Sequence, residues 1–181
     1  MPRVAEIPLA RRFGLAFLAI ALGSAIFHGR IAEALVTRGD SFLQTGQAVR
    51  AEQYYGRAVW WDRTSPVAAD RYAFTAFQLR TPQALAAAIR VANEALRRFP
   101  DDARLLADRA LCLQAAGEFR AARADFARAA ELERDPRLLH FAGHAALRAG
   151  DVAAARRYWH EALRLDPSFE PAALALRKVG A

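Results

Sequence analysis

The chain is poor in the residues that build covalent or metal-held frameworks, since its 181 residues include one cysteine and one methionine. Cys112 has no disulfide partner in the chain, and a cysteine-rich metal cluster is excluded. There is also no glycine-rich phosphate loop and no pair of carboxylates set for acid–base catalysis. We therefore expect no enzymatic activity, cofactor, metal or small-molecule substrate, and we expect Cys112 to be a buried structural thiol.

The charge balance is basic, with 26 Lys and Arg residues against 19 Asp and Glu residues and a formal net charge of +7. Nucleic-acid binding requires a patch or stripe of cations that follows the phosphate backbone. Lys178 is the one lysine of the chain, and the arginines are spread along it without a continuous stripe. We therefore predict no nucleic-acid partner.

Alanines recur with a fixed period in two series that lie seven residues apart. Within each series the intervals are 37, 34 and 33 residues. The first series is Ala51, Ala88, Ala122 and Ala155, and the second is Ala58, Ala95, Ala129 and Ala162. A period of this length indicates one helical unit copied four times, and such units stack into a solenoid that works by contact.

Two further positions agree when the copies are aligned. The eighth residue of each copy is small and the twenty-fourth is aromatic in three of four copies: Gly39 with Tyr55, Ala76 with Ala92, Ala110 with Phe126, and Gly143 with Trp159. Small residues let two antiparallel helices approach closely, and we expect the large ring to fill the space between one helix pair and the next. Turn residues separate the two helices of each copy: Gly46, Gly117 and Gly150 in three copies, and Thr81 with Pro82 in the second.

These features resemble the tetratricopeptide repeat, and the fourth copy, with Trp159, Ala162 and the Asp166-Pro167 pair, is the most similar. The resemblance implies an all-α fold, a right-handed α-solenoid of four helix pairs. We expect the repeats within residues 31–169, at 32–68, 69–102, 103–135 and 136–169, followed by a capping helix within 170–181. The family works as a protein–protein interaction scaffold, so the resemblance implies a protein partner, a peptide or a helix.

Residues 13–27 contain no charged side chain and hold eight strong hydrophobes. At about −0.5 kcal/mol each, these contribute about −4 kcal/mol toward membrane insertion. As a helix the stretch is about 22 Å long, against about 30 Å of hydrocarbon. We predict a transmembrane signal-anchor helix over residues 13–30, after a short cytoplasmic segment at 1–12.

The arginines before and after this segment give a weak bias that places the N-terminus in the cytoplasm. The sequence then predicts a single-pass protein of the bacterial inner membrane, with its repeats in the periplasm, that serves in the assembly of an envelope complex. The alternative is a soluble periplasmic binding module released by signal-peptide cleavage after Gly23 or Ala34.

In this family the first helix of each copy lines a groove. The positions that usually face it, and that we predict to bind the partner, are Phe74, Phe77, Arg80, Arg104, Asp108, Arg137, His140, Phe141, His144 and Arg148. Phenylalanines beside arginines favour an extended or helical segment with apolar anchors and some acidic character. The alternative is that Phe74 and Phe141 are core residues and the arginines form a solvated rim.

A third hypothesis is a hydrolase that uses Ser41 or a metal at His140 and His144. The sequence around Ser41 resembles the nucleophile block of GDS-type esterases, but it falls inside a predicted helix, whereas serine activation needs a sharp turn. His140 and His144 point the same way from one helix, and a third ligand would have to come from elsewhere, such as Asp108. We therefore expect these histidines to contact a partner.

Overall fold

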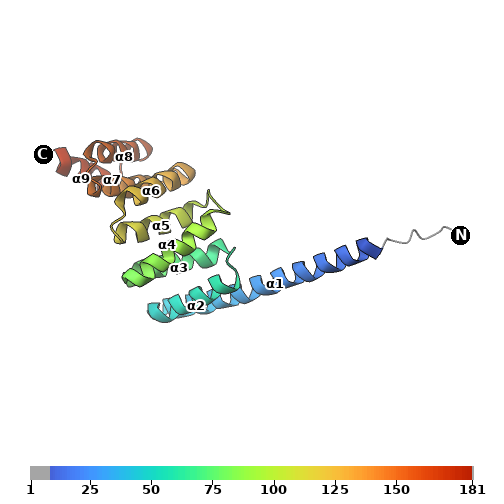
Figure 1. Cartoon of the computed structure of the whole chain (residues 1–181). Helices are drawn as coiled ribbons and strands as arrows, with labels where there is room; N and C mark the ends of the chain where they lie inside the picture. The colour runs from blue at the N-terminus through green and yellow to red at the C-terminus, as the bar shows by residue number, and fades with distance from the viewer. Residues whose placement is uncertain (1–8, 181) are drawn as a thin grey trace.

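The computed structural model describes residues 9–180 of the chain, and the side chains of residues 23, 24 and 26–180. Over residues 9–180 the fold consists of nine α-helices and no strand, as the sequence predicts (Figure 1). The helices are α1 (Leu9–Gln44), α2 (Ala48–Trp61), α3 (Pro66–Leu79), α4 (Pro82–Leu96), α5 (Ala103–Ala115), α6 (Phe119–Glu133), α7 (Pro136–Arg148), α8 (Val152–Leu165) and α9 (Glu170–Gly180).

The helix ends follow the turn chemistry of the sequence. Gly46, Gly117 and Gly150 have φ angles of 75°, 87° and 84°, a region that L-residues rarely adopt. In the second repeat the side chain of Thr81 instead accepts a hydrogen bond of 3.2 Å from the backbone N–H of Ala84, and Pro82 opens the helix. The turn residues therefore separate the paired helices as predicted.

The recurring alanines lie at the contacts between helices. All four alanines of the first series are fully buried, at 0% exposure. A Cβ atom at Gly39 would lie 2.5 Å from Cε1 of Tyr55, and one at Gly143 would overlap the indole of Trp159. The eighth residue of these repeats therefore receives the ring of the twenty-fourth, so the ring packs within its own repeat. The prediction that the ring fills the space between one pair and the next is wrong, because the absent Cβ of the glycine leaves room for the ring inside the pair.

The helices form antiparallel pairs, α1 with α2, α3 with α4, α5 with α6 and α7 with α8, and the pairs stack in chain order (Figure 1). Helix α3 also packs on α5, whereas α5 barely approaches α7. Helix α9 covers α8 and buries Ala172 and Ala175. The stack thus ends in a helix at the place where the sequence predicts one.

Helix α1 has 36 residues, and its N-terminal half extends beyond the stacked pairs (Figure 1). Over the described residues, no helix combines the length and the apolar character that crossing a bilayer demands. The predicted anchor over residues 13–30 is therefore wrong, and so is the single-pass inner-membrane location with periplasmic repeats that depended on it. The reason is length, because the uncharged stretch of about 22 Å is too short for about 30 Å of hydrocarbon.

The remaining N-terminal predictions stay untested. Residues 1–8 of the predicted cytoplasmic segment lie outside the described residues. Both candidate cleavage sites, after Gly23 and after Ala34, fall inside α1. Cleavage after Ala34 would remove Ala32, which is 2% exposed and belongs to the core of the first repeats.

Candidate functional site

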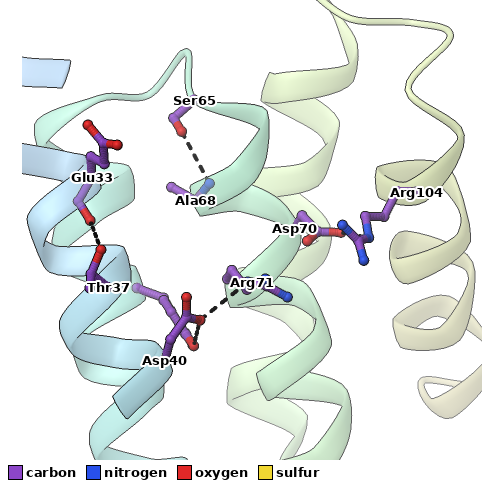
Figure 2. Close-up of polar contacts among 9 residues, drawn as sticks. Glu33, Thr37, Asp40, Ser65, Ala68, Asp70, Arg71 and Arg104 are labelled. Carbon is purple, nitrogen blue, oxygen red and sulfur yellow. Dashed lines mark hydrogen bonds and ion pairs between the residues drawn. The ribbon is translucent and has the colours of Figure 1, made fainter. Parts of the chain in front are cut away.

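The predicted binding residues belong to the first helices of the repeats. We call the surface formed by α1, α3, α5 and α7 the first-helix face. Figure 2 shows polar side chains that link three of these helices, with Asp40 of α1 beside Arg71 of α3, and Asp70 of α3 beside Arg104 of α5. Oδ1 of Asp40 lies 3.3 Å from Nε of Arg71, and it also accepts a hydrogen bond of 2.7 Å from the hydroxyl of Tyr55.

Buried Asp70 of α3 and half-buried Asp108 of α5 form a carboxyl pair between the two helices. Asp70 is 6% exposed, and no hydrogen-bond donor reaches its Oδ1. Nε of Arg104 lies 3.7 Å from this oxygen, beyond hydrogen-bond distance. Burial raises the pKa of Asp108 to about 9, and a hydrogen bond to Asp70 and the charge of Asp70 act in the same direction. Two neighbouring carboxyl groups with few donors can share one proton, so Asp108 is protonated at neutral pH.

A hollow opens where α5 and α7 diverge. It has a volume of about 690 Å³, and its lining joins the end of α6 to these two helices. Four of the ten predicted binding residues line it: Arg104, Asp108, Arg137 and Phe141. Glu133, Asp135, Ala107 and Leu138 complete the wall. The structure therefore places predicted residues from the third and fourth repeats around one concave site.

The two arginines of this hollow differ in their freedom. Arg137 is held by Asp135, because its Nε and Nη2 donate to the Asp135 carboxylate at 3.0 and 2.7 Å. This pairing lowers the pKa of Asp135. The Arg104 side chain is 71% exposed and makes only the long contact to Asp70. The N–H groups of the Arg104 guanidinium can therefore donate hydrogen bonds to an anion that enters the hollow.

Phe141 gives the hollow an apolar wall. Its ring stacks on Phe126 of α6, with centroids 5.4 Å apart, yet Phe141 remains 39% exposed. Phe126 is 1% exposed, so one ring of this pair belongs to the core and the other to the surface. Phe141 therefore packs partly on the core, as the alternative interpretation has it, and also keeps an exposed surface, while its binding role stays a prediction.

Predicted residues from α3 lie toward the other end of the first-helix face. Phe74 is 37% exposed, and Phe77 is partly buried against the core of the first two repeats. Arg80 ends α3 in the left-handed conformation, with φ at 53°, and its guanidinium lies 5.1 Å from the centroid of the Phe77 ring. Arg148 of α7 likewise stacks on Phe119 of α6, at 4.5 Å from the ring centroid. These residues are not part of the hollow.

His140 and His144 face each other on α7. Their Nε2 atoms are 3.1 Å apart, and the rings meet edge to face with centroids 4.4 Å apart. Burial, and then the charge of His144, lower the pKa of His140 to about 4. Burial and Lys178 lower the pKa of His144. Within residues 23–180, Asp108 does not join these histidines in a group of three metal ligands.

Ser41 lies inside α1 as the sequence predicts. Its hydroxyl donates to the carbonyl of Arg38 at 2.7 Å, so the side chain is bonded to its own helix. This helical setting lacks the sharp strand-to-helix turn that presents a nucleophilic serine.

Sequence reasoning missed Asp70 and Arg71, which the structure places at the centre of the polar contacts between α1, α3 and α5 (Figure 2). The signal in the sequence was Asp70 itself, a charged residue at a position of α3 that is buried in the structure. Glu133 and Asp135, which help to line the hollow, were missed because they lie at the end of α6 and just before α7, outside the first helices of the repeats.

Residues 136–169 match the tetratricopeptide repeat family. The match covers the fourth helix pair, α7 and α8. No curated protein matches the chain, but solved structures share its fold. The structure "MamA 41-end" from Desulfovibrio magneticus RS-1 has a TM-score of 0.66 at 17% identity, over 76% of this chain and 77% of that one.

Two more solved structures show the same tetratricopeptide-type arrangement. A crystal structure of MamA protein has a TM-score of 0.67 at 20% identity, over 75% of this chain and 73% of that one. Pseudomonas aeruginosa pilF also has a TM-score of 0.67, at 21% identity, over 84% of this chain and 68% of that one. These similarities establish the α-solenoid fold. Tetratricopeptide repeats are in general modules that bind other proteins.

Proposed function

We propose that the chain is a non-enzymatic scaffold that binds a segment of a protein partner on its first-helix face, with the α5–α7 hollow as the main contact. The observation that carries the proposal is the composition of that hollow. Exposed Phe141 and the free guanidinium of Arg104 line the same concavity of about 690 Å³. An apolar anchor beside an available charge is typical of sites that recognise peptides.

The lining also defines the chemistry of the partner. An apolar side chain of the partner would pack against Phe141 and Leu138, where it would remove apolar surface from water. A neighbouring carboxylate of the partner would accept hydrogen bonds from Arg104, since Arg137 already binds Asp135. We therefore propose an extended or helical segment with one apolar anchor close to one acidic residue, bound as part of the assembly of a larger complex.

In-cell photocrosslinking tests this proposal. A photoreactive phenylalanine analogue at position 141 should form adducts with one protein, and the same analogue at Arg156, an exposed position on α8, should not. Arg104→Glu should abolish the adduct from position 141 because it repels the partner carboxylate. Arg156→Glu makes the same change of charge away from the hollow and should leave the adduct unchanged.

Two outcomes would contradict the proposal. One is equal crosslinking from positions 141 and 156, which would indicate contact without a preferred face. The other is an adduct that survives Arg104→Glu in a variant whose helical content and unfolding midpoint match those of the native chain.

A further inference from the structure

A pair of histidines on α7 has the geometry of a chelate. His140 and His144 lie one helical turn apart, and their Nε2 atoms are 3.1 Å apart. Two imidazole nitrogens bound to one tetrahedral zinc ion, at about 2.0–2.1 Å each, lie about 3.3 Å from one another. The ring positions of the metal-free chain therefore need little adjustment to bind one ion together.

Aromatic side chains hold both rings in place. The ring of His144 lies 5.4 Å from that of Trp159, and the ring of His140 lies 5.7 Å from that of Phe169, both edge to face. Trp159 is itself fixed, because it is fully buried and its Nε1–H donates to the carbonyl of His140 at 3.2 Å. A ligand pair whose rotamers are locked by packing loses little entropy when it binds an ion.

We propose that Nε2 of His140 and Nε2 of His144 together bind one divalent transition-metal ion of the class that prefers imidazole, namely Zn²⁺, Ni²⁺ or Cu²⁺. In the metal-free chain one Nε2–H donates to the other Nε2, so a single hydrogen occupies the space between them. The ion takes the place of that hydrogen, which moves to Nδ1 of the same ring. Both nitrogens then offer a lone pair to the ion.

The two histidines supply two ligands of the proposed site. Within residues 23–180, no third His, Cys, Asp or Glu side chain joins the pair in a metal-binding group. The other coordination positions therefore go to water or to a side chain of a bound protein, as in sites that keep exchangeable positions. Lys178 is the charged group that acts on His144, and its ammonium opposes the charge of the ion. This inference does not depend on partner binding at the hollow.

Trp159 provides a built-in reporter for the test. Cu²⁺ and Ni²⁺ quench nearby indoles, so titration of the full chain with Cu²⁺ at neutral pH should give saturable partial quenching with a stoichiometry of one ion per chain. Zn²⁺, which does not quench, should compete and restore the fluorescence. Mutation of a residue that only hydrogen-bonds a metal ligand typically weakens metal binding by about 10- to 100-fold. Loss of one of the two histidine ligands should therefore weaken Cu²⁺ binding by at least about tenfold.

The decisive variants are His140→Gln and His144→Gln, singly and together, and each should weaken Cu²⁺ binding. His160→Gln and His28→Gln are matched controls, since His160 is an exposed residue of α8 and the His28 ring lies beside Trp61. Both controls should bind Cu²⁺ as the native chain does. The proposal fails if the native titration does not saturate, if the double variant binds with native affinity, or if a control variant abolishes quenching.

A second measurement uses the native chain and so does not depend on the folding of any variant. In ¹⁵N-resolved spectra of the histidine rings, Zn²⁺ should shift Nε2 of His140 and of His144 and leave His28 and His160 unchanged. Equal shifts at all four histidines, or no shift at His140 and His144, would overturn the assignment.

Discussion

One added methyl group at position 143 tests whether the small residue of each repeat exists to receive a ring. In Gly143→Ala the new Cβ would overlap Nε1, Cδ1 and Cε2 of the Trp159 indole. Trp159 is 0% exposed, so its ring has no free space to enter. The indole must move, and the hydrogen bond of 3.2 Å from its Nε1–H to the carbonyl of His140 is then lost or lengthened.

The expected magnitude is a balance of three effects. Alanine favours a helix interior over glycine by about 1 kcal/mol. Overpacking costs about 1 to 3 kcal/mol, and a lost hydrogen bond costs about 0.5 to 1.5 kcal/mol. We therefore expect Gly143→Ala to lower the free energy of unfolding by about 0.5 to 3.5 kcal/mol, although the same exchange stabilises an ordinary helix.

Gly56 in α2 provides the matched control. A Cβ there would lie 3.4 Å from Cε2 of Tyr72, an ordinary contact. Gly56→Ala should therefore raise the free energy of unfolding by about 0.5 to 1 kcal/mol. Urea unfolding followed by far-ultraviolet circular dichroism measures both variants. The reasoning is refuted if Gly143→Ala is as stable as the native chain, or if Gly56→Ala loses as much as Gly143→Ala.

Three other variants probe charge and capping. Asp108→Asn mimics the protonated carboxyl. Burial raises the pKa of Asp108 from 3.8 to about 9 in the folded chain, so the free energy of unfolding of the native chain falls as pH rises between these values. The free energy of unfolding of the variant should therefore exceed that of the native chain by more than about 1 kcal/mol at slightly basic pH and by almost nothing near pH 4. A gain independent of pH in urea titrations would contradict this. Arg109→Met leaves Asp125 buried without its bonds of 2.6 and 2.7 Å and should cost about 3 to 5 kcal/mol by urea unfolding, whereas a loss under about 1 kcal/mol would show that the pair is not structural. Asp102→Ala removes the cap that accepts from the backbone N–H of Leu105 at 3.0 Å and should cost about 1 kcal/mol in thermal unfolding, while Asp102→Asn should retain the native midpoint; equal losses would argue against capping.

The sequence was sufficient for features that form within one repeat. The alanine series recurs with the period of the helix pair, so its spacing along the chain predicts buried positions at the helix contacts. The ring at the twenty-fourth position was predicted at the right residue but in the wrong place, since it packs inside its own pair and not between pairs. The turn glycines and the caps at Ser65 and Thr81 are also local, because each acts within three residues of itself. These features were therefore predictable without knowing how one repeat is rotated on the next.

Contacts between repeats were not predictable in the same way. Asp70 and Asp108 come from different repeats, and their meeting depends on how α3 and α5 pack. Arg109 occupies a position where the tetratricopeptide repeat usually has an apolar residue. The sequence shows this difference, but it does not show which side chains pair with the charge of Arg109. The structure supplies the compensation, since Arg109 binds Asp125 of α6 bidentately and donates to Asn93 of α4 at 2.7 Å.

The membrane anchor was predicted incorrectly because composition was given more weight than length. Eight strong hydrophobes in residues 13–27 supply a favourable insertion energy, but a helix must also extend across the hydrocarbon. Length was therefore the better criterion, and it was already available from the sequence.

The position of the hollow follows from the side chains that separate the first helices. Helix α3 packs on α5, and the thiol of Cys112 donates to the carbonyl of Ala73 at 3.3 Å across this contact. Between α5 and α7 the ring of Phe141 stacks on Phe126 of α6 instead of filling the space beside α5. Phe141 therefore packs on the core through Phe126 and keeps part of its apolar surface exposed in the hollow that Arg104 also lines.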